Sequence, residues 1–320
     1  MHIKRALSLA LSVILITASI FALWQRQAIN DWWVLRSYDP PSAISQLATD
    51  TTMSAEGRKI FYLTKPKLQQ KSEFQKSCTS TEQTIVLGCY KTNEGIYVYD
   101  VDDARLAGVQ QVTAAHEMLH AAYDRLSSSE KQKIDSLTQQ AFNSLSNDRI
   151  KTNVEAYRKK DAAVVPNELH SILGSEVSQL PAELEQHYKR YFDDRKKVVA
   201  YSEAYEKEFS EREKQVASYD AQLEQLRQRY ESLKSKILTE ESELSSLIAS
   251  LNELSYSNDI ATYNSKVNQY KRLYSSYTSN IAEINKIVES YKTILDKRNA
   301  IALEEQSLLQ SIDTRVSSNP

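Results

Sequence analysis

The segment His116-Glu117-Met118-Leu119-His120 combines two imidazoles and a carboxylate at a spacing that suits metal chemistry. On a helix, residues four apart lie on one face, so His116 and His120 can reach a single ion. Imidazole nitrogen suits Zn²⁺, which in catalytic sites has three protein ligands and a water. The metal would make that water a nucleophile near neutral pH, and Glu117 would take its proton. The motif therefore predicts one Zn²⁺ ion with Glu117 as the catalytic residue; two histidines on a surface helix are the alternative.

The third ligand must come from elsewhere, because no histidine follows His120 at the spacing of the longer zinc motif. Glu155, Glu168 and Glu176 are the candidates. Gly after a helix often marks its end, so Gly174 would place Glu168 on a packed helix and Glu176 in the exit turn. A packed helix holds a ligand at about 2.0–2.2 Å better than a turn does. Glu168 is therefore the predicted third ligand, and an exposed carboxylate at a helix start is its alternative role.

Residues 83–176 resemble the zinc domain of the gluzincin metalloproteases, in which a glutamate on a later helix completes the H-E-x-x-H site. Asn167 followed by Glu168 is similar to the start of the glutamate helix in thermolysin-like enzymes and in lethal-factor-like toxins. The similarity is partial, because Ile172 stands where those families have an acid. The partner that orients a ligand histidine is therefore not identified, and Glu176 remains a rival ligand.

The resemblance implies a metallopeptidase whose substrate is a peptide or a protein. It also implies that a strand before the metal-binding helix pairs with extended substrate, and residues 95–101 are the candidate for that strand. A histidine downstream of the third ligand stabilises the oxyanion in thermolysin-like enzymes, which suggests this role for His170. A packed histidine is the alternative.

The elements around the motif predict an α+β, zincin-like domain at residues 25–195 of a mostly helical chain. Segments 59–63, 84–90 and 95–101 carry the β-branched and aromatic residues that favour strands. A helical apolar period over 106–126 would present the metal motif. Cys78 and Cys89, the only two cysteines, are too few for a four-thiolate zinc module. They can close a small loop as a disulfide in an oxidising compartment, with two unrelated thiols as the alternative.

The first residues predict a membrane anchor. Lys4 and Arg5 precede the apolar run 6–24, which at about 1.5 Å per residue covers most of a bilayer core about 30 Å thick. A cleaved signal peptide is the alternative, but its apolar region is normally about 7–15 residues long. The basic residues predict a cytoplasmic tail, 1–5, and place the rest of the chain outside. We therefore expect a single-pass signal-anchor protein of the cell membrane, most consistent with a bacterial envelope.

Residues 196–315 predict an antiparallel coiled-coil hairpin, followed by a short tail, 316–320. Apolar and tyrosine side chains recur at heptad spacing from Phe209 to Leu251 and again from Tyr263 to Leu295. A polar segment between the two arms suggests a turn, and one continuous helix pairing with a second copy is the alternative. Such a hairpin would serve as a spacer or as a docking surface for a protein partner.

The composition excludes some functions and leaves two. With 40 Lys+Arg against 42 Asp+Glu and a net charge of −2, the chain offers no basic footprint for nucleic acid. A mean hydropathy of −0.52 excludes a polytopic membrane protein. A membrane-anchored zinc endopeptidase and a non-catalytic envelope scaffold remain. The presence of Glu117 favours the enzyme, because a purely structural metal site needs ligands but no general base.

Overall fold

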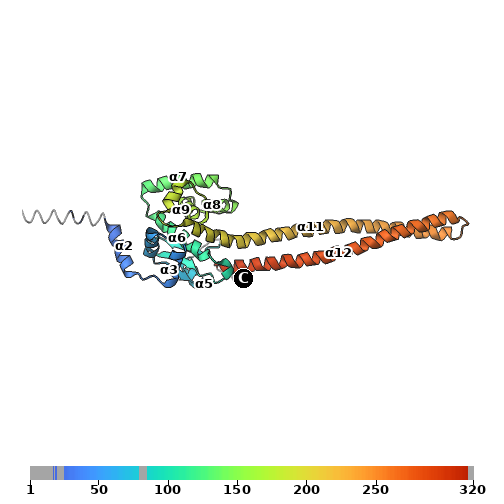
Figure 1. Ribbon diagram of the computed structural model, residues 1–320, viewed down its shortest axis with the longest axis horizontal. Coiled ribbons are helices and arrows are strands. Elements are labelled where there is room, and N and C mark those ends of the chain that lie inside the picture. Colours follow the sequence, from blue (N-terminus) through green and yellow to red (C-terminus); the bar gives the residue numbers. More distant parts are fainter. Residues whose placement is uncertain (1–16, 18, 20–24, 79–84, 316–320) are drawn as a thin grey trace, which may run out of the picture. The chain divides into compact units, whose positions relative to one another are not determined.

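The computed structural model describes residues 17, 19, 25–78 and 85–315 (Figure 1). The chain divides into two compact units, one of Met1–Lys207 with Leu308–Pro320 and one of Glu208–Ser307. The shorter helices are α2 (Arg26–Ser37), α3 (Ser42–Asp50), α4 (Ala55–Leu63), α5 (Lys71–Ser77), η1 (Ala104–Leu106), α6 (Val109–Asp124), α7 (Ser128–Ser144), α8 (Asp148–Lys160), α9 (Val165–Glu176) and α10 (Ala182–Tyr188). The strands are β1 (Lys67–Gln69), β2 (Gly88–Lys91) and β3 (Gly95–Tyr99), and the long helices are α11 (Arg195–Leu254) and α12 (Ile260–Ile312).

Helix α6 lies at the centre of the first unit, where nearly all of its residues are buried. Its apolar side chains, among them Ala115, Met118 and Leu119, are fully buried in the main core. The helix packs against α9 on one side and against β2 and β3 on another. This packing fixes the orientation of the side chains that α6 presents.

Gly174 lies inside α9, and the prediction that it ends that helix is wrong, since α9 continues to Glu176. A Cβ atom at Gly174 would come within 2.5 Å of Leu119 Cδ1 and 2.6 Å of Tyr188 Cε1. The glycine is therefore needed for the close approach of α9 to α6, rather than for a turn.

The sheet has three short strands in the order β1-β3-β2. Strands β1 and β3 are parallel, whereas β2 and β3 form an antiparallel pair in which Cys89 lies opposite Tyr97. A disulfide between Cys78, directly after α5, and Cys89 ties β2 to the preceding helix. The predicted disulfide is confirmed.

The prediction of an α+β, zincin-like core is wrong. The described residues are mostly helical, and their sheet is small. Segment 59–63, expected as a strand, belongs to α4, because Ser54 caps that helix by accepting a hydrogen bond from Gly57 N. The buried residues of this helix are Gly57, Ile60 and Phe61, which have the i, i+3, i+4 spacing of one helix face. The branched and aromatic character of Ile60 and Phe61 reflects burial and not strand formation.

The predicted membrane anchor is also contradicted. In the described parts of the chain, no helix combines the length and apolar character needed to cross a membrane. The helix after the predicted span, α2, has only 12 residues, and its Asp31 is buried in ion pairs with Lys59 and Arg125. Most of the span 6–24, like the tails 1–5 and 316–320, falls outside the described residues. The expected single-pass cell-membrane location is therefore not supported.

In the second unit, α11 and α12 run antiparallel, side by side (Figure 1). Three polar pairs show the antiparallel order: Asp220 pairs with Arg298, Arg229 with Glu283, and Glu240 with Asn280. As the residue number on α11 increases, the number of its partner on α12 decreases. Leu223, Leu244 and Ile287 are buried between the helices. Glu240, the polar residue within the apolar seam, is buried and accepts hydrogen bonds from Ser276 and Asn280, both at 2.7 Å.

Candidate metal centre

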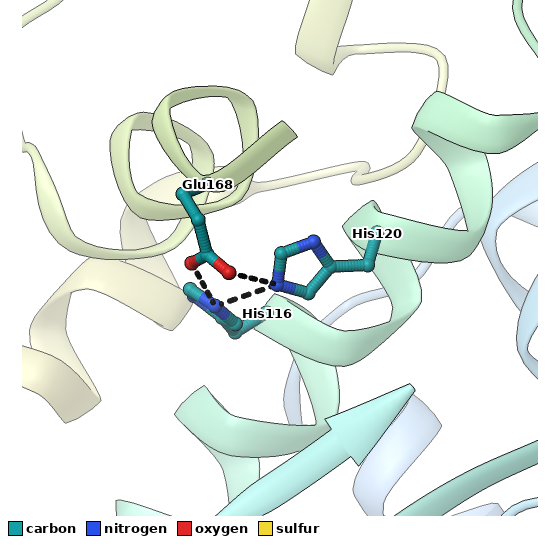
Figure 2. Close-up of side chains that lie close together, drawn as sticks. All are labelled: His116, His120 and Glu168. Atoms are coloured by element: carbon teal, nitrogen blue, oxygen red, sulfur yellow. Dashed lines mark hydrogen bonds and ion pairs between the residues drawn. The ribbon is translucent and has the colours of Figure 1, made fainter. Parts of the chain in front are cut away.

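Two turns of α6 and the first turns of α9 bring His116, His120 and Glu168 together (Figure 2). The Nε2 atoms of the two imidazoles lie 3.0 Å apart. One oxygen of Glu168 lies 3.8 Å from His116 Nε2, and its other oxygen lies 3.8 Å from His120 Nε2. The three ligand atoms are all within 4.8 Å of one another. The structure thus places at one point the three residues that the sequence predicts as metal ligands.

The opposite ring nitrogens face hydrogen-bond acceptors. His120 Nδ1 lies 2.9 Å from Asn167 Oδ1. His116 Nδ1 lies 3.4 Å from Ser175 Oγ, whose own hydroxyl donates to Ser171 O at 2.8 Å. An Nδ1 atom next to an acceptor carries the proton, which leaves the lone pair on Nε2. Both rings are therefore in the tautomer that binds metal through Nε2.

The two Nε2 atoms, 3.0 Å apart, share one cation, which is a proton in the metal-free protein and can be replaced by a metal ion. Tetrahedral Zn²⁺ with Zn–N bonds of about 2.0–2.1 Å would hold two nitrogens roughly 3.3 Å apart, close to the observed separation. Glu168 Oε2 is buried without a hydrogen-bond partner, which is costly for a carboxylate unless a cation is near. The residues present fit a metal ion with two nitrogen ligands and one oxygen ligand.

The pKa shifts of His116, His120 and Glu168 also fit a cation between the three side chains. Burial opposes protonation of His116, but the carboxylates of Glu168 and its neighbours outweigh burial and raise the pKa of His116 to about 9. Burial and the charge on His116 lower the pKa of His120 to about 4. Burial opposes ionisation of Glu168, yet the two imidazoles lower its pKa. Without metal, the histidine pair therefore holds one proton at neutral pH, in the place that a metal ion would take.

Glu117 lies beside the first imidazole and is also buried, with 6% of its surface exposed. Burial raises the pKa of Glu117 to about 7, against the opposing effects of His116 and of a hydrogen bond from the Tyr90 backbone. Gly88 makes room for this carboxylate, since a Cβ atom there would lie 2.8 Å from Glu117 Oε1 and 2.5 Å from Thr113 Cγ2. The carboxyl group can exchange a proton near neutral pH, as a general base requires.

The centre opens into a cleft of about 580 Å³ that His116, Glu117, His120 and Glu168 line together with β2. A second cavity of about 550 Å³ shares His116 and Glu117 and has a mixed lining: apolar side chains and tyrosines (Ile85, Val86, Leu87, Val112, Ala156, Tyr157 and Tyr205) together with the polar Thr113, Asn153, Lys160 and Glu176. The metal centre is therefore accessible from a space large enough for a ligand.

The strand beside the cleft is β2 and not β3. Residues 95–101, proposed from the resemblance as the substrate-pairing strand, include β3, which lies between β1 and β2 and has both edges paired. Tyr99 N donates to Leu87 O, so Gly88 and Tyr90 direct their backbone groups away from β3. The edge available to an extended ligand therefore belongs to β2, which the hairpin places next to Glu117.

Other sequence-predicted residues lie in different surroundings. Glu155 is on α8 and pairs with Arg158 on the same helix, away from the ligand cluster. His170 is fully buried, 2.9 Å from His187 Nε2, so its suggested oxyanion role is not supported by its position. Glu176 lies on the Nδ1 side of His116, with its Oε1 atom 3.9 Å from that nitrogen.

Sequence reasoning did not assign roles to Asn167, Ser175, Gly88 and Arg149. Asn167 precedes the predicted ligand, and its position next to Glu168 was the one available signal. The other three have no recognisable spacing from the metal motif, because they reach the centre through the packing of α8, α9 and β2 around α6.

Comparison with protein-family models, with curated proteins and with solved structures finds no match to this chain. The chemistry of the centre therefore has to be inferred from its own side chains.

Proposed function

We propose that this protein is a zinc-dependent endopeptidase in which His116, His120 and Glu168 hold the ion and Glu117 transfers the proton. The observation that carries this proposal is the convergence of the two Nε2 atoms and a buried carboxylate beside a second carboxyl group of raised pKa. A structural metal site would have no use for the second carboxyl group.

When bound, zinc polarises a carbonyl and lowers the pKa of a water ligand to about 7. Glu117 accepts the proton of the attacking water and delivers it to the leaving amine. In the metal-free protein its carboxyl group ionises near neutral pH, and such a group can take and return a proton. Asn167 and Ser175 keep the imidazoles in the metal-binding tautomer throughout.

A peptide is the substrate class that the surroundings favour. The outward backbone groups of Gly88 in β2 can pair with an extended chain, as in other cases of strand addition. The adjoining cavity between Val112 and Tyr205 has the size and the apolar side chains to take a bulky side chain next to the bond being cleaved.

The test is Glu117→Gln, which keeps the shape of the side chain but removes the proton acceptor. We expect zinc to remain bound and hydrolysis of a quenched peptide library to fall by about 10²–10⁴-fold. Glu155→Gln is the matched control, because Glu155 is a rejected ligand candidate on exposed α8 and should change neither property.

Equal hydrolysis by wild type and Glu117→Gln would remove Glu117 from the proposed role. If both proteins bind zinc and neither hydrolyses any peptide, the metal is structural and the scaffold interpretation is favoured.

A further inference from the structure

Behind the metal cluster, Glu176 lies on the side of His116 that faces away from the other ligands. Its Oε1 atom is 3.9 Å from His116 Nδ1, whereas Glu168 approaches Nε2 of the same ring. The two rival glutamates therefore meet opposite nitrogens of one imidazole. Only the Nε2 side leads to His120, so Glu176 is placed to orient His116 and not to share its metal.

Glu176 is held in this place by Arg149 of α8. Arg149 Nη2 donates to Glu176 Oε2 at 2.7 Å, and the same nitrogen also donates to Glu206 of α11. Glu206 in turn accepts a hydrogen bond from Ser202 Oγ at 3.0 Å. The guanidinium thus bridges two carboxylates from different helices, and it turns one oxygen of Glu176 away from the imidazole.

Tyr205, next to Glu206 in the chain, lines the cavity beside the metal centre. The bridge therefore lies at the wall of this cavity, on the Nδ1 side of a proposed metal ligand. The side chain of Glu176 is 13% exposed and lines the same cavity. Loss of the guanidinium would leave a buried carboxylate free to move toward any nearby cation.

We infer that Glu176 is a positioning residue for His116 and that Arg149, bridged to Glu206, keeps Glu176 in that role and out of the metal's coordination. This inference rests on the proposed function, since it concerns the same metal centre. Glu206 of α11, Arg149 of α8 and Glu176 of α9 thus form one chain of contacts, which ends at the imidazole ring of His116.

The experiment measures the zinc affinity of the full chain by competition with a chromophoric chelator, independently of any cleavage. Outer partners of metal ligands typically contribute about 10–100-fold to affinity, so Glu176→Gln should weaken zinc by this factor while one ion is still bound at saturation. Arg149→Gln should weaken zinc similarly, and Arg149→Lys should restore part of the loss.

The double variant Arg149→Gln/Glu176→Gln is the decisive comparison, because a residue that acts through Glu176 has no further effect once Glu176 is replaced. Arg158→Gln is the matched control on the same helix, since Arg158 pairs only locally with Glu155, and it should leave affinity unchanged. If Arg149→Gln fails to fold, Glu206→Gln tests the same bridge, because it removes the second carboxylate that Arg149 contacts.

Additive losses in the double variant, or unchanged affinity in Glu176→Gln, would overturn the inference while leaving the proposed function intact. Loss of all zinc from Glu176→Gln with retention in Glu168→Gln would show that Glu176 is the ligand, which also overturns it. A wild-type chain that binds no zinc would overturn the proposed function itself and the inference with it.

Discussion

The first unit contains two histidine pairs whose Nε2 atoms are in contact, and their surroundings differ. His116 and His120 are 3.0 Å apart and face Glu168 at the wall of a cleft. His170 and His187 are 2.9 Å apart and are enclosed by Tyr123, Tyr188 and Tyr191. Among the described residues, only the first pair belongs to a cluster of three metal-ligating side chains.

The difference shows that two adjacent imidazoles do not by themselves make a metal site. Burial lowers the pKa of both rings in the second pair, so both are neutral and one N–H can donate to the other ring. In the first pair each Nδ1 atom faces its own acceptor, so the proton between the Nε2 atoms is an additional one, and the carboxylate of Glu168 balances its charge. The partners of the rings therefore distinguish a packed histidine pair from a candidate metal site.

The largest expected effect separates the two pairs by metal content. His116→Ala/His120→Ala should lose the zinc that wild type retains after dialysis, because two of three ligands are gone. His187→Gln should retain one zinc per chain, since His187 belongs to the enclosed pair. Elemental analysis of the purified proteins measures both results.

Circular dichroism serves as the control for folding of each variant. Equal zinc in wild type and in His116→Ala/His120→Ala would place the ion elsewhere, and loss of zinc from a folded His187→Gln protein would assign the metal to the wrong pair.

The second-largest expected effect is the pH dependence of zinc binding by His116 and His120. The metal-free form of this pair holds one proton below about pH 9, the pKa of His116, and zinc must displace it. Apparent zinc affinity should therefore fall about tenfold for each unit of decrease between pH 8 and pH 5. Chelator competition across this range, with correction for protonation of the chelator, gives the slope.

A slope near zero would contradict the proton-bound state of the metal-free pair. His187→Gln should give the same slope as wild type, because the enclosed pair does not exchange its protons for metal.

The smallest expected effect is on acid stability and comes from the second pair. The unfolded chain binds a proton at His187 below about pH 6.5, whereas burial lowers the pKa of His187 in the folded protein to about 4. Protonation therefore favours the unfolded state, and stability falls as the pH falls from 6.5 toward 4. At pH 5 this loss is on the order of 2 kcal/mol relative to pH 7.5.

Urea unfolding of metal-free wild type and His187→Gln at pH 7.5 and pH 5 measures this contribution. The difference between the two pH values should be smaller in the variant, which lacks the titrating group. An identical difference in both proteins would show that folding does not lower the pKa of His187.

Sequence reasoning worked where a single helix holds the whole pattern. The spacing of His116 and His120 needs only α6, and a helix is regular enough to bring residues four apart to one face. The pairing of Cys78 with Cys89 likewise joins residues only 11 positions apart in the chain. The periodic segments at the end of the chain form α11 and α12 for the same local reason.

Predictions from the sequence were wrong where packing between separate helices and strands determines the structure. Gly174 looked like a helix end, but its small size serves the contact with Leu119 and Tyr188. Segment 59–63 looked like a strand, but capping by Ser54 and burial in the core make it helical. His170 looked like a catalytic group, but it points into the tyrosine cluster. In each case the residue type was suited to more than one environment.

By itself, the sequence determined the chemical groups of the candidate centre, because two imidazoles and the carboxyl group of Glu117 are placed by the pitch of one helix. Only the tertiary structure decided which glutamate faces Nε2 and which faces Nδ1 of His116. Glu168 and Glu176 occur on the same helix. Their positions depend on where α9 crosses α6 and on the hydrogen bond from Arg149 of α8 to Glu176. Such contacts join residues far apart in the chain, and the local periodicity of apolar residues carries no information about them.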